Sequence, residues 1–351
     1  MRKFVKGNEA VVIGALHAGC DVYFGYPITP ASEIAHAAAE FFPALGKEFL
    51  QAECETGSIN MIYGAASAGK LAMTASSGPG MSLMQEGLSY LAGAQLPAVV
   101  VNVMRTGPGL GNIGPEQGDY NQAVKGGGHG NYRNIVLAPG SVQEMCDLTM
   151  LAFDLAFRYR NPAVVLADAV LGQMMESLRI PDTVASRPET WSWAVHGDAR
   201  TRGNLITSIY LEPDRHEVHN QVLQRKYEEL KRETRSESYR TEDAEIVLTG
   251  YGSCARIARS AVDILRREGT RAGLFRPITL SPFPREELNR AAKGRKVLVV
   301  EMSNGQYRDD VLLHLDRGCD SPVALVNRMG GNLVKVDEVL SGARRMLEVR
   351  A

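Results

Sequence analysis

Two side chains, Thr29 and Glu55, occupy positions where a polar group could act on a ligand. Thr29 lies in the segment Tyr-Pro-Ile-Thr-Pro, where Pro27 and Pro30 restrict the backbone on both sides. A hydroxyl held this rigidly can hydrogen-bond a ligand, or it can serve only in a turn. Glu55 precedes a run of small and apolar residues, INMIYGAASAG. A carboxylate against such a wall suits acid–base chemistry, whereas an exposed one would only favour the helix dipole.

A third candidate, Arg105, directly follows the apolar run Ala98–Met104. A continuous β-branched run of this length is typical of a strand buried on both faces, and open α/β sheets bind ligands where such strands end. A guanidinium there can hold a carboxylate through two hydrogen bonds, or it can form a surface ion pair. The sequence around Arg105 leaves both roles open.

Strands and helices alternate through the first half of the chain. Helical spacing runs through residues 58–69 and 142–159, while Val164–Asp168 repeats the buried-strand signal of residues 98–104. Alternation of this kind predicts an α/β fold with a mainly parallel, doubly wound sheet. We assign this first domain to residues 1–179.

The composition changes in the middle of the chain. Apolar strands are absent from residues 180–243, and residues 216–240 form a charged stretch with helical spacing. Because glutamates are interspersed among the lysines and arginines, we predict a solvated helix and linker and not a nucleic-acid-binding face. A second α/β domain then covers residues 244–351. Its predicted strands are Glu245–Thr249, Arg271–Phe275, Lys296–Glu301 and Val323–Val326.

Glycine-rich segments allow the backbone to approach a ligand closely. Residues 106–118 (TGPGLGNIGPEQG) either bind a ligand or cover a site. Residues 125–130 (KGGGHG) lack the spacing of a phosphate-binding loop, and we predict a flexible segment near the site or a subunit interface. Gly250–Ser253 connects a strand to a helix, where backbone amides could bind an anion. The dinucleotide glycine pattern is missing there, so we favour helix–strand packing.

Composition excludes several classes of protein. The 351 residues carry a formal net charge of −1, so no global field favours nucleic acid or an anionic membrane. The five cysteines form no CxxC pair, which argues against a zinc site or an iron–sulfur cluster and indicates reduced thiols. The apolar runs are too short to span a membrane, and the first residues lack the core of a signal peptide. We therefore expect a cytoplasmic protein.

Four stretches occur in an order that points to one family. They are Tyr26–Pro30, Glu55 with Gly64-Ala65 nine residues on, Arg105 after its strand, and the set Phe275–Leu280, Leu298–Met302 and Asn327–Gly331. These stretches resemble the alpha subunits of 2-oxoacid:ferredoxin oxidoreductases. Within that family, residues 107–133 (GPGLGNIGPEQGDYNQAVKGGGHGNYR) are most similar to the branched-chain group. That group oxidises 3-methyl-2-oxobutanoate, also called 2-oxoisovalerate.

The resemblance implies a fold and three roles. The fold is a thiamine-diphosphate pyrimidine-binding-type domain, with a doubly wound parallel sheet, followed by a transketolase C-terminal-like α/β domain. Glu55 would be the catalytic, cofactor-binding glutamate at N1′ of the aminopyrimidine. Thr29 and Arg105 would bind the oxoacid.

One stretch departs from the family pattern. Relatives usually carry Glu-(Val/Ile)-Ala-Ala-Ile-Asn where this chain reads Glu-Thr-Gly-Ser-Ile-Asn from Glu55. Gly57 costs a helix about 1 kcal/mol relative to alanine. Glu53 lies two residues earlier, so the choice of Glu55 depends on its spacing to Gly64.

Partner chains follow from a missing motif. Thiamine enzymes hold the diphosphate and magnesium with a Gly-Asp-Gly segment, and the nearest segment here is Gly118-Asp119-Tyr120. The resemblance therefore implies a separate beta subunit with that motif, gamma and iron–sulfur delta subunits or domains, and ferredoxin. Magnesium and the iron–sulfur clusters would lie on these partners. Together they would convert a branched 2-oxoacid and CoA to acyl-CoA, carbon dioxide and reduced ferredoxin.

Three other functions stay open. A 2-oxoglutarate enzyme would need a second cation, from Lys125, Arg133 or the beta subunit. A scaffold subunit without turnover would not need the Thr29, Glu55 and Arg105 set. A nucleotide-dependent dehydrogenase would need the GxGxxG pattern that this chain lacks.

Overall fold

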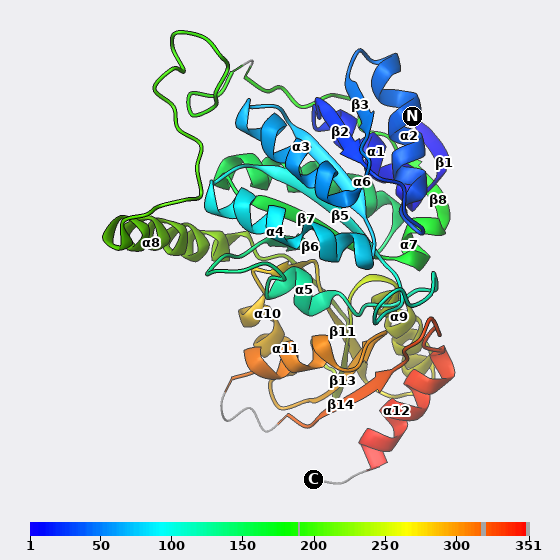
Figure 1. Ribbon diagram of the computed structural model, residues 1–351. Coiled ribbons are helices and arrows are strands. Elements are labelled where there is room, and N and C mark those ends of the chain that lie inside the picture. The colour runs from blue at the N-terminus through cyan, green and yellow to red at the C-terminus, as the bar shows by residue number, and fades with distance from the viewer. Residues whose placement is uncertain (189, 317–320, 349–351) are drawn as a thin grey trace.

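The computed structural model of the protein describes residues 1–188, 190–316 and 321–348. Two large sheets organise the chain, the first in the upper part and the second in the lower part of Figure 1. Cys319 lies outside the described residues, and Cys20, Cys54, Cys146 and Cys254 are free thiols. No helix in the described ranges is long and apolar enough to cross a membrane.

The first sheet has seven strands in the order β12-β6-β7-β5-β4-β2-β3. Six of them are parallel, and only β12 pairs antiparallel, with β6. This arrangement confirms the predicted doubly wound sheet. The strands are β2 (Val22–Gly25), β3 (Glu48–Gln51), β4 (Ala72–Ser76), β5 (Ala98–Met104), β6 (Ile135–Leu137), β7 (Pro162–Asp168) and β12 (Thr279–Ser281).

Helices cover both faces of this sheet. Strand β5 shows why, because Val99, Val101 and Val103 face one apolar cluster while Ala98 and Val100 face another. Such alternation buries both faces of a strand. The first cluster is covered by α1 (Gly7–His17), α2 (Ser32–Ala44) and α6 (Val142–Tyr159), and the second by α3 (Glu55–Ser67) and α4 (Pro79–Gly93).

Shorter elements complete the first domain. Strands β1 (Arg2–Lys6) and β8 (Met175–Arg179) form a separate antiparallel pair beside α1. Helices α5 (Tyr120–Val124) and α7 (Ala169–Gln173) come after the carboxyl ends of β5 and β7, respectively. Both lie toward the second domain.

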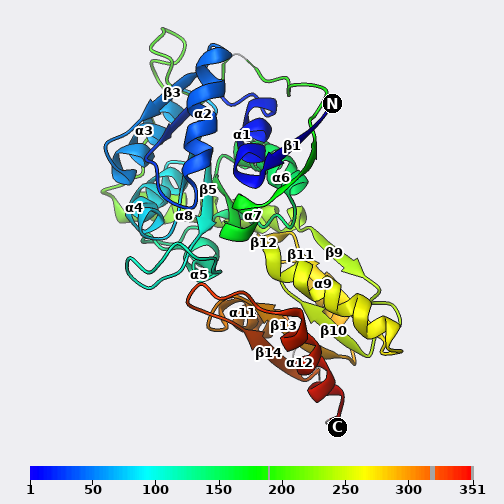
Figure 2. The ribbon, with the colours of Figure 1, turned by 90° about the vertical axis from the view of Figure 1, so that its right-hand side faces the viewer.

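The second sheet has five strands in the order β14-β13-β10-β11-β9. They are β9 (Ser236–Tyr239), β10 (Ile246–Thr249), β11 (Ala272–Pro277), β13 (Lys296–Glu301) and β14 (Val323–Asn327). Its helices are α9 (Gly252–Arg267), α10 (Arg285–Ala292), α11 (Gln306–His314) and α12 (Val336–Glu348), seen from the side in Figure 2. Each predicted strand of this domain overlaps an observed one.

Two strands cross the predicted domain boundaries. Strand β9 belongs to the second sheet although it lies in the segment 180–243, and β12 joins the first sheet although it lies beyond residue 244. The division at 179/180 and 243/244 therefore stays a prediction. These boundaries follow the order of segments along the chain, but they do not predict which sheet β9 and β12 join.

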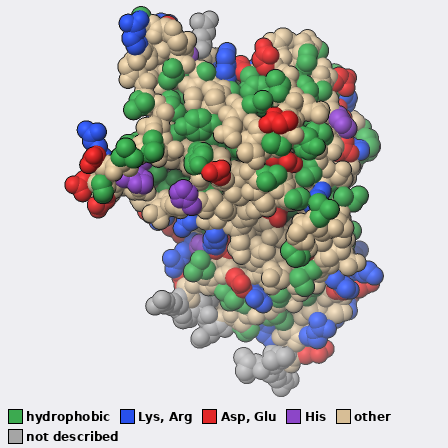
Figure 3. Space-filling view, in the orientation of Figure 1, with side chains coloured by type: hydrophobic (Ala, Val, Ile, Leu, Met, Phe, Trp, Pro, Cys, Tyr) green, Lys and Arg blue, Asp and Glu red, His purple; other side chains and the backbone are tan. Residues whose placement is uncertain are grey.

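The prediction for the charged middle segment is partly wrong. Helix α8 (Pro213–Leu230) ends at Leu230, a short 3-10 turn spans Lys231–Glu233, and β9 follows. The predicted continuation of the helix to residue 240 is wrong, because β9 gains backbone hydrogen bonds to the edge of β11. Nor is α8 fully solvated: Leu223, Tyr227 and Leu230 pack into the first core, and Figure 3 shows charges on its free side.

Candidate active site

The candidate site lies at the edge of the first sheet where its parallel strands end. The segments after β2, β3, β4 and β5 carry Thr29, Glu55, the turn Gly78–Gly80 and Arg105. Carboxyl ends of parallel strands share one edge of a sheet, which is where open α/β sheets bind ligands. The fold therefore gathers residues that are far apart in the sequence.

Glu55 is the first residue of α3 and is 5% exposed. The helix begins normally, because the Cys54 Sγ accepts a hydrogen bond from the Gly57 amide at 3.3 Å, and α3 runs through Gly57 without a break. No hydrogen bond or ion pair from the described residues reaches the Glu55 carboxylate. A buried carboxylate without a donor is costly unless a ligand supplies one.

Glu53 differs from Glu55 in its surroundings. Glu53 is exposed, and its carboxylate lies against Gly57 on the outside of α3. The sequence could not separate these two glutamates except by spacing. Burial now favours Glu55 as the residue that meets a ligand inside the site.

Arg105 is 8% exposed and forms no ion pair within the described residues. Its Nη1 donates to the Thr29 carbonyl at 2.9 Å and its Nη2 to the Leu110 carbonyl at 3.2 Å, while Nε is buried without a partner. The surface ion pair that the sequence allowed is therefore wrong. An unpaired buried guanidinium suits an anionic ligand, because a buried charge needs a counter-charge.

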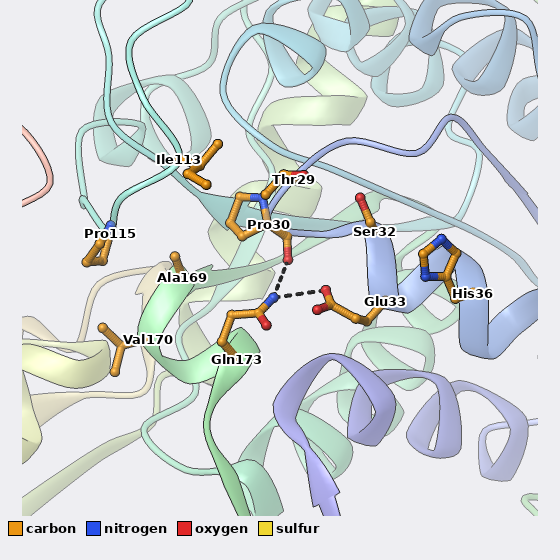
Figure 4. Close-up of a pocket in the computed structure, with 10 residues that line it drawn as sticks. All are labelled: Thr29, Pro30, Ser32, Glu33, His36, Ile113, Pro115, Ala169, Val170 and Gln173. Atoms are coloured by element: carbon orange, nitrogen blue, oxygen red, sulfur yellow. Dashed lines mark hydrogen bonds between the residues drawn. The ribbon is translucent and has the colours of Figure 1, made fainter.

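Thr29 is exposed and lines a cavity with a volume of about 470 Å³. Figure 4 shows this cavity between the Thr29 turn, helix α2 and helix α7, with Ile113 and Pro115 lining it on the side of the loop after β5. The Gln173 Nε2 donates to the Pro30 carbonyl at 3.0 Å and to Glu33 at 2.9 Å. Helix α7 therefore holds the turn that presents Thr29.

The turn Gly78–Gly80 was missed in the sequence. It follows β4 and starts α4 with Pro79 at the first helical position, a placement that favours helix initiation. A Cβ atom at Gly80 would lie 2.4 Å from the Glu55 Oε1, so only glycine allows this approach. A Cβ at Gly78 would lie 3.2 Å from the Arg105 Cγ. The turn thus separates Glu55 from Arg105 and contacts both.

Two hydroxyls beside this turn were also missed. Ser76 and Ser77 are fully buried, and their Oγ atoms have no hydrogen-bond partner among the described residues. Buried polar atoms normally have partners, so these two hydroxyls are candidates for contact with another molecule. Their only signal in the sequence was a pair of serines between a strand and a Gly-Pro-Gly turn.

Asp119, in the segment nearest to a Gly-Asp-Gly motif, lies behind the same turn. Its Oδ2 accepts from the Asn102 Nδ2 at 3.0 Å. Burial raises the pKa of Asp119, and hydrogen bonds from Asn102 and the Gly78 amide act in the opposite direction. Among the described residues, no three His, Cys, Asp or Glu side chains gather as a set of metal ligands.

The other predicted features lie elsewhere. In residues 125–130, Lys125 forms an ion pair with Asp310 of the second domain, and His129 is exposed. The Ser253 amide, at the start of α9, donates to the Asp168 carboxylate at 2.9 Å. The anion that the Gly250–Ser253 segment binds is therefore a side chain of this chain.

Comparisons with known proteins show the family of this chain. Residues 13–240 match the family model for pyruvate flavodoxin/ferredoxin oxidoreductase, thiamine-diphosphate-binding, and residues 244–339 match pyruvate:ferredoxin oxidoreductase core domain II. The chain belongs to the 2-oxoacid:ferredoxin oxidoreductases. It is an alpha-type subunit of that family, as its resemblance implied.

Two curated relatives span nearly the whole chain. The ketoisovalerate oxidoreductase subunit VorB of Methanothermobacter marburgensis is 61% identical over 98% of this chain and 97% of its own length. The 2-oxoglutarate synthase subunit KorA of Archaeoglobus fulgidus is 39% identical, over 97% and 99%. The names of both describe subunits, so a 2-oxoacid:ferredoxin oxidoreductase chain of this type works with partner chains.

Solved structures share the fold. The 2-oxoglutarate:ferredoxin oxidoreductase from Magnetococcus marinus superimposes with a TM-score of 0.88 and 25% identity, over 98% of this chain and 65% of that chain. This oxidoreductase subunit therefore lacks about a third of the length of that solved chain. A split-gene transketolase gives a TM-score of 0.61 at 13% identity, which shows the fold alone.

The residues present fit part of thiamine diphosphate, the cofactor that this family binds. An aminopyrimidine ring offers N–H donors. The Glu55 carboxylate is a buried acceptor that receives no hydrogen bond from the described residues. The free Ser76 and Ser77 hydroxyls add polar contacts nearby. These residues fit the pyrimidine half of the cofactor.

Proposed function

We propose that this chain is the alpha subunit of a 3-methyl-2-oxobutanoate:ferredoxin oxidoreductase. The reaction converts the branched 2-oxoacid, CoA and oxidised ferredoxin to acyl-CoA, carbon dioxide and reduced ferredoxin. One observation carries the proposal: a buried carboxylate, Glu55, and a buried guanidinium, Arg105, flank one glycine turn, and neither forms an ion pair among the described residues. The 61% identity to a ketoisovalerate oxidoreductase subunit supports the choice of substrate.

Glu55 is the proposed acid–base residue. Thiamine diphosphate, when bound, supplies a carbon nucleophile that its own aminopyrimidine generates. Glu55 would hold the proton at N1′ of that ring, because its carboxylate is buried and no described residue competes for it. A positioned acid–base group of this kind typically contributes about 10²–10⁴-fold to a rate.

Arg105 and Thr29 are the proposed substrate residues. The Thr29 and Leu110 carbonyls orient the guanidinium by accepting from its two terminal nitrogens. Its Nε–H, the second N–H of each terminal nitrogen and its charge are then available to the oxoacid carboxylate. The Thr29 side chain adjoins the cavity beside it and can hydrogen-bond the keto or carboxylate oxygens.

The two cations that the 2-oxoglutarate alternative named on this chain, Lys125 and Arg133, lie away from the Thr29 cavity. Lys125 is paired with Asp310, and Arg133 lies beside it, with its Nη1 donating to the Lys125 carbonyl at 3.3 Å. Both line a groove between the domains, whereas Thr29 lines a different cavity. A cation from a beta subunit would still serve that substrate, so the two oxoacids have to be compared directly.

The remaining parts of the enzyme are assigned to partner subunits. We propose a beta subunit for the diphosphate and magnesium, and gamma and delta subunits for iron–sulfur clusters that pass electrons to ferredoxin. The lack of a Gly-Asp-Gly segment in the sequence supports this division for the diphosphate and magnesium. We propose a cytoplasmic assembly, in keeping with cysteines that form no disulfide among the described residues.

A test of the function compares the chain alone with the chain co-purified with its partners. The complex should reduce a viologen dye with 3-methyl-2-oxobutanoate and CoA, and the chain alone should not. In a panel of oxoacids, kcat/KM should be highest for branched aliphatic acids. Turnover by the isolated chain would overturn the subunit assignment, and a preference for 2-oxoglutarate would overturn the substrate assignment.

A further inference from the structure

The loop after Arg105 folds back on its own base. The Thr106 amide donates to the Gly114 carbonyl at 3.1 Å, and Pro115 returns beside Arg105 as an antiparallel bridge. Between these points the Leu110 carbonyl accepts from the Arg105 Nη2. The orientation of the guanidinium therefore depends on how this loop, residues 106–114, is held.

The Glu116 side chain connects the base of the loop 106–114 to the second domain. Its side chain is 6% exposed and forms no ion pair among the described residues. One carboxylate oxygen, Oε2, accepts from the Gly107 amide at 2.9 Å at the base of the loop. The other, Oε1, accepts from the Gly330 amide at 3.2 Å in the second domain. A buried carboxylate is retained here by two backbone donors from two domains.

The second domain offers a matching turn. Gly330 has a φ of +73°, which favours glycine, and its carbonyl accepts from the Asn112 Nδ2 at 3.3 Å. Gln117, which follows Glu116, is fully buried and exchanges two hydrogen bonds with the Met302 backbone, at 2.7 and 3.0 Å. The loop therefore contacts the second domain at Gly330, and the segment that follows the loop contacts it at Met302.

We propose that Glu116 is a positioning residue for oxoacid binding, through which the second domain holds the loop that orients Arg105. The inference rests on the proposed role of Arg105 in substrate binding. Glu116 need not touch the oxoacid. Without its carboxylate, the Gly107 and Gly330 amides lose their shared acceptor, and the loop loses its carboxylate link to the second domain, so Leu110 is held less firmly beside Arg105.

The test uses the complex with its partner subunits and four variants: Glu116→Ala, Glu116→Gln, Arg105→Ala and Asp310→Asn. Glu116→Ala should lower kcat/KM for the oxoacid by about 10- to 100-fold, mainly through KM, because small misplacements of binding groups cost this much. Glu116→Gln retains one acceptor and should lose about 5-fold. The KM for CoA and the affinity for thiamine diphosphate should not change.

Asp310→Asn is the matched control. Asp310 is also buried, and it also joins the domains, since the Tyr120 Oη donates to its Oδ2 at 2.6 Å. It does not contact the loop 106–114, so its loss should leave the KM for the oxoacid within about 3-fold of wild type. Hydrogen exchange gives a second readout: the Gly107 and Gly330 amides should exchange faster only in the Glu116 variants.

The outcomes separate the two proposals. If Arg105→Ala weakens oxoacid kinetics while Glu116→Ala does not, the positioning role is refuted and the proposed function stands. Equal losses in the Glu116 and Asp310 variants, with CoA kinetics impaired as well, would reduce the effect to domain packing and refute the role. If Arg105→Ala leaves oxoacid kinetics unchanged, the proposed substrate site and this inference fall together.

Discussion

At the scale of residues, the site is marked by polar groups that the fold buries without partners. Ser76, Ser77 and the Arg105 Nε have no hydrogen-bond partner, and Glu55 has no donor among the described residues. Each such group costs free energy in the isolated chain. Their position beside the Gly78–Gly80 turn supports the ligand site proposed there.

Replacing Glu55 tests the acid–base assignment directly. Glu55→Gln should lower kcat of the assembled enzyme by about 10²–10⁴-fold, because the amide cannot hold the proton that a carboxylate exchanges. Glu53→Gln is the matched control, since Glu53 is exposed two residues earlier. Its turnover should stay close to wild type. Wild-type activity in Glu55→Gln together with loss in Glu53→Gln would reverse the assignment.

At the scale of elements, the turn between β4 and α4 brings two functions together. Gly80 packs on Glu55 at the start of α3, and Gly78 packs on Arg105 at the end of β5. Helix α4 in turn packs along α3, where Gly87 lies against Ile59. The distance between the Glu55 carboxylate and the Arg105 guanidinium therefore depends on how α4 packs between α3 and β5.

Adding a methyl group at Gly80 should disturb the site more than it disturbs the fold. In Gly80→Ala the new Cβ would lie 2.1 Å from the Ser76 Oγ and 2.4 Å from the Glu55 Oε1, so the carboxylate must move. We expect kcat to fall by about 10-fold or more, with weaker thiamine diphosphate binding. Turnover and cofactor affinity of the complex check this.

Gly87→Ala tests whether a packing defect in α4 alone lowers activity. Its Cβ would lie 2.5 Å from the Ile59 Cγ2, so overpacking of α4 against α3 should cost about 1–3 kcal/mol of stability. Turnover of the assembled protein below its melting temperature should remain near wild type. Equal losses of activity in the Gly80 and Gly87 variants would show that the site responds to any strain in α4.

At the scale of the whole molecule, ion pairs and capped helices join the two domains. Arg276 of β11 forms a bidentate pair with Glu144 of α6, at 2.6 and 2.7 Å, and also contacts Glu237 of β9 at 3.0 Å. Asp168 at the end of β7 accepts from the Ser253 amide of α9. These contacts explain the Phe275–Leu280 motif as a connection between domains.

Removing Arg276 should weaken that connection measurably. The side chains of Arg276 and Glu144 are 8% and 28% exposed, so Arg276→Ala should cost about 2–3 kcal/mol, below the value for a fully buried pair. Arg344→Ala, in an exposed pair with Glu268, should cost less than about 1 kcal/mol. Thermal unfolding of both variants at neutral pH tests the difference.

The same pair predicts a pH dependence. Burial alone would raise the pKa of Glu144, but hydrogen bonds and the charge of Arg276 outweigh it, so the pKa lies below its usual value. Its contribution to stability is therefore present above the unfolded-state pKa and is lost as pH falls through the folded-state pKa. The stability gap between wild type and Arg276→Ala should narrow in acid. A gap independent of pH would contradict this.

Local patterns in the sequence were enough to predict several of the strands. The continuous apolar run Ala98–Met104 indicates a strand buried on both faces, and Val164–Asp168 gives a similar signal. Thr29, Glu55 and Arg105 were chosen from short motifs together with the family resemblance, and their roles stay predictions. Information of this kind is carried within about ten neighbours, because periodicity and turn chemistry are local properties.

Only the tertiary structure decided which groups meet. Gly80 contacts Glu55 from 25 positions away, Glu116 bonds to Gly330 across 214, and β9 forms because β11 offers it an edge. The choice between Glu55 and Glu53 likewise required burial, since both carry the same side chain near the same helix start. These outcomes depend on packing between distant segments. A local sequence pattern cannot predict a contact with a residue that comes near only in the folded protein.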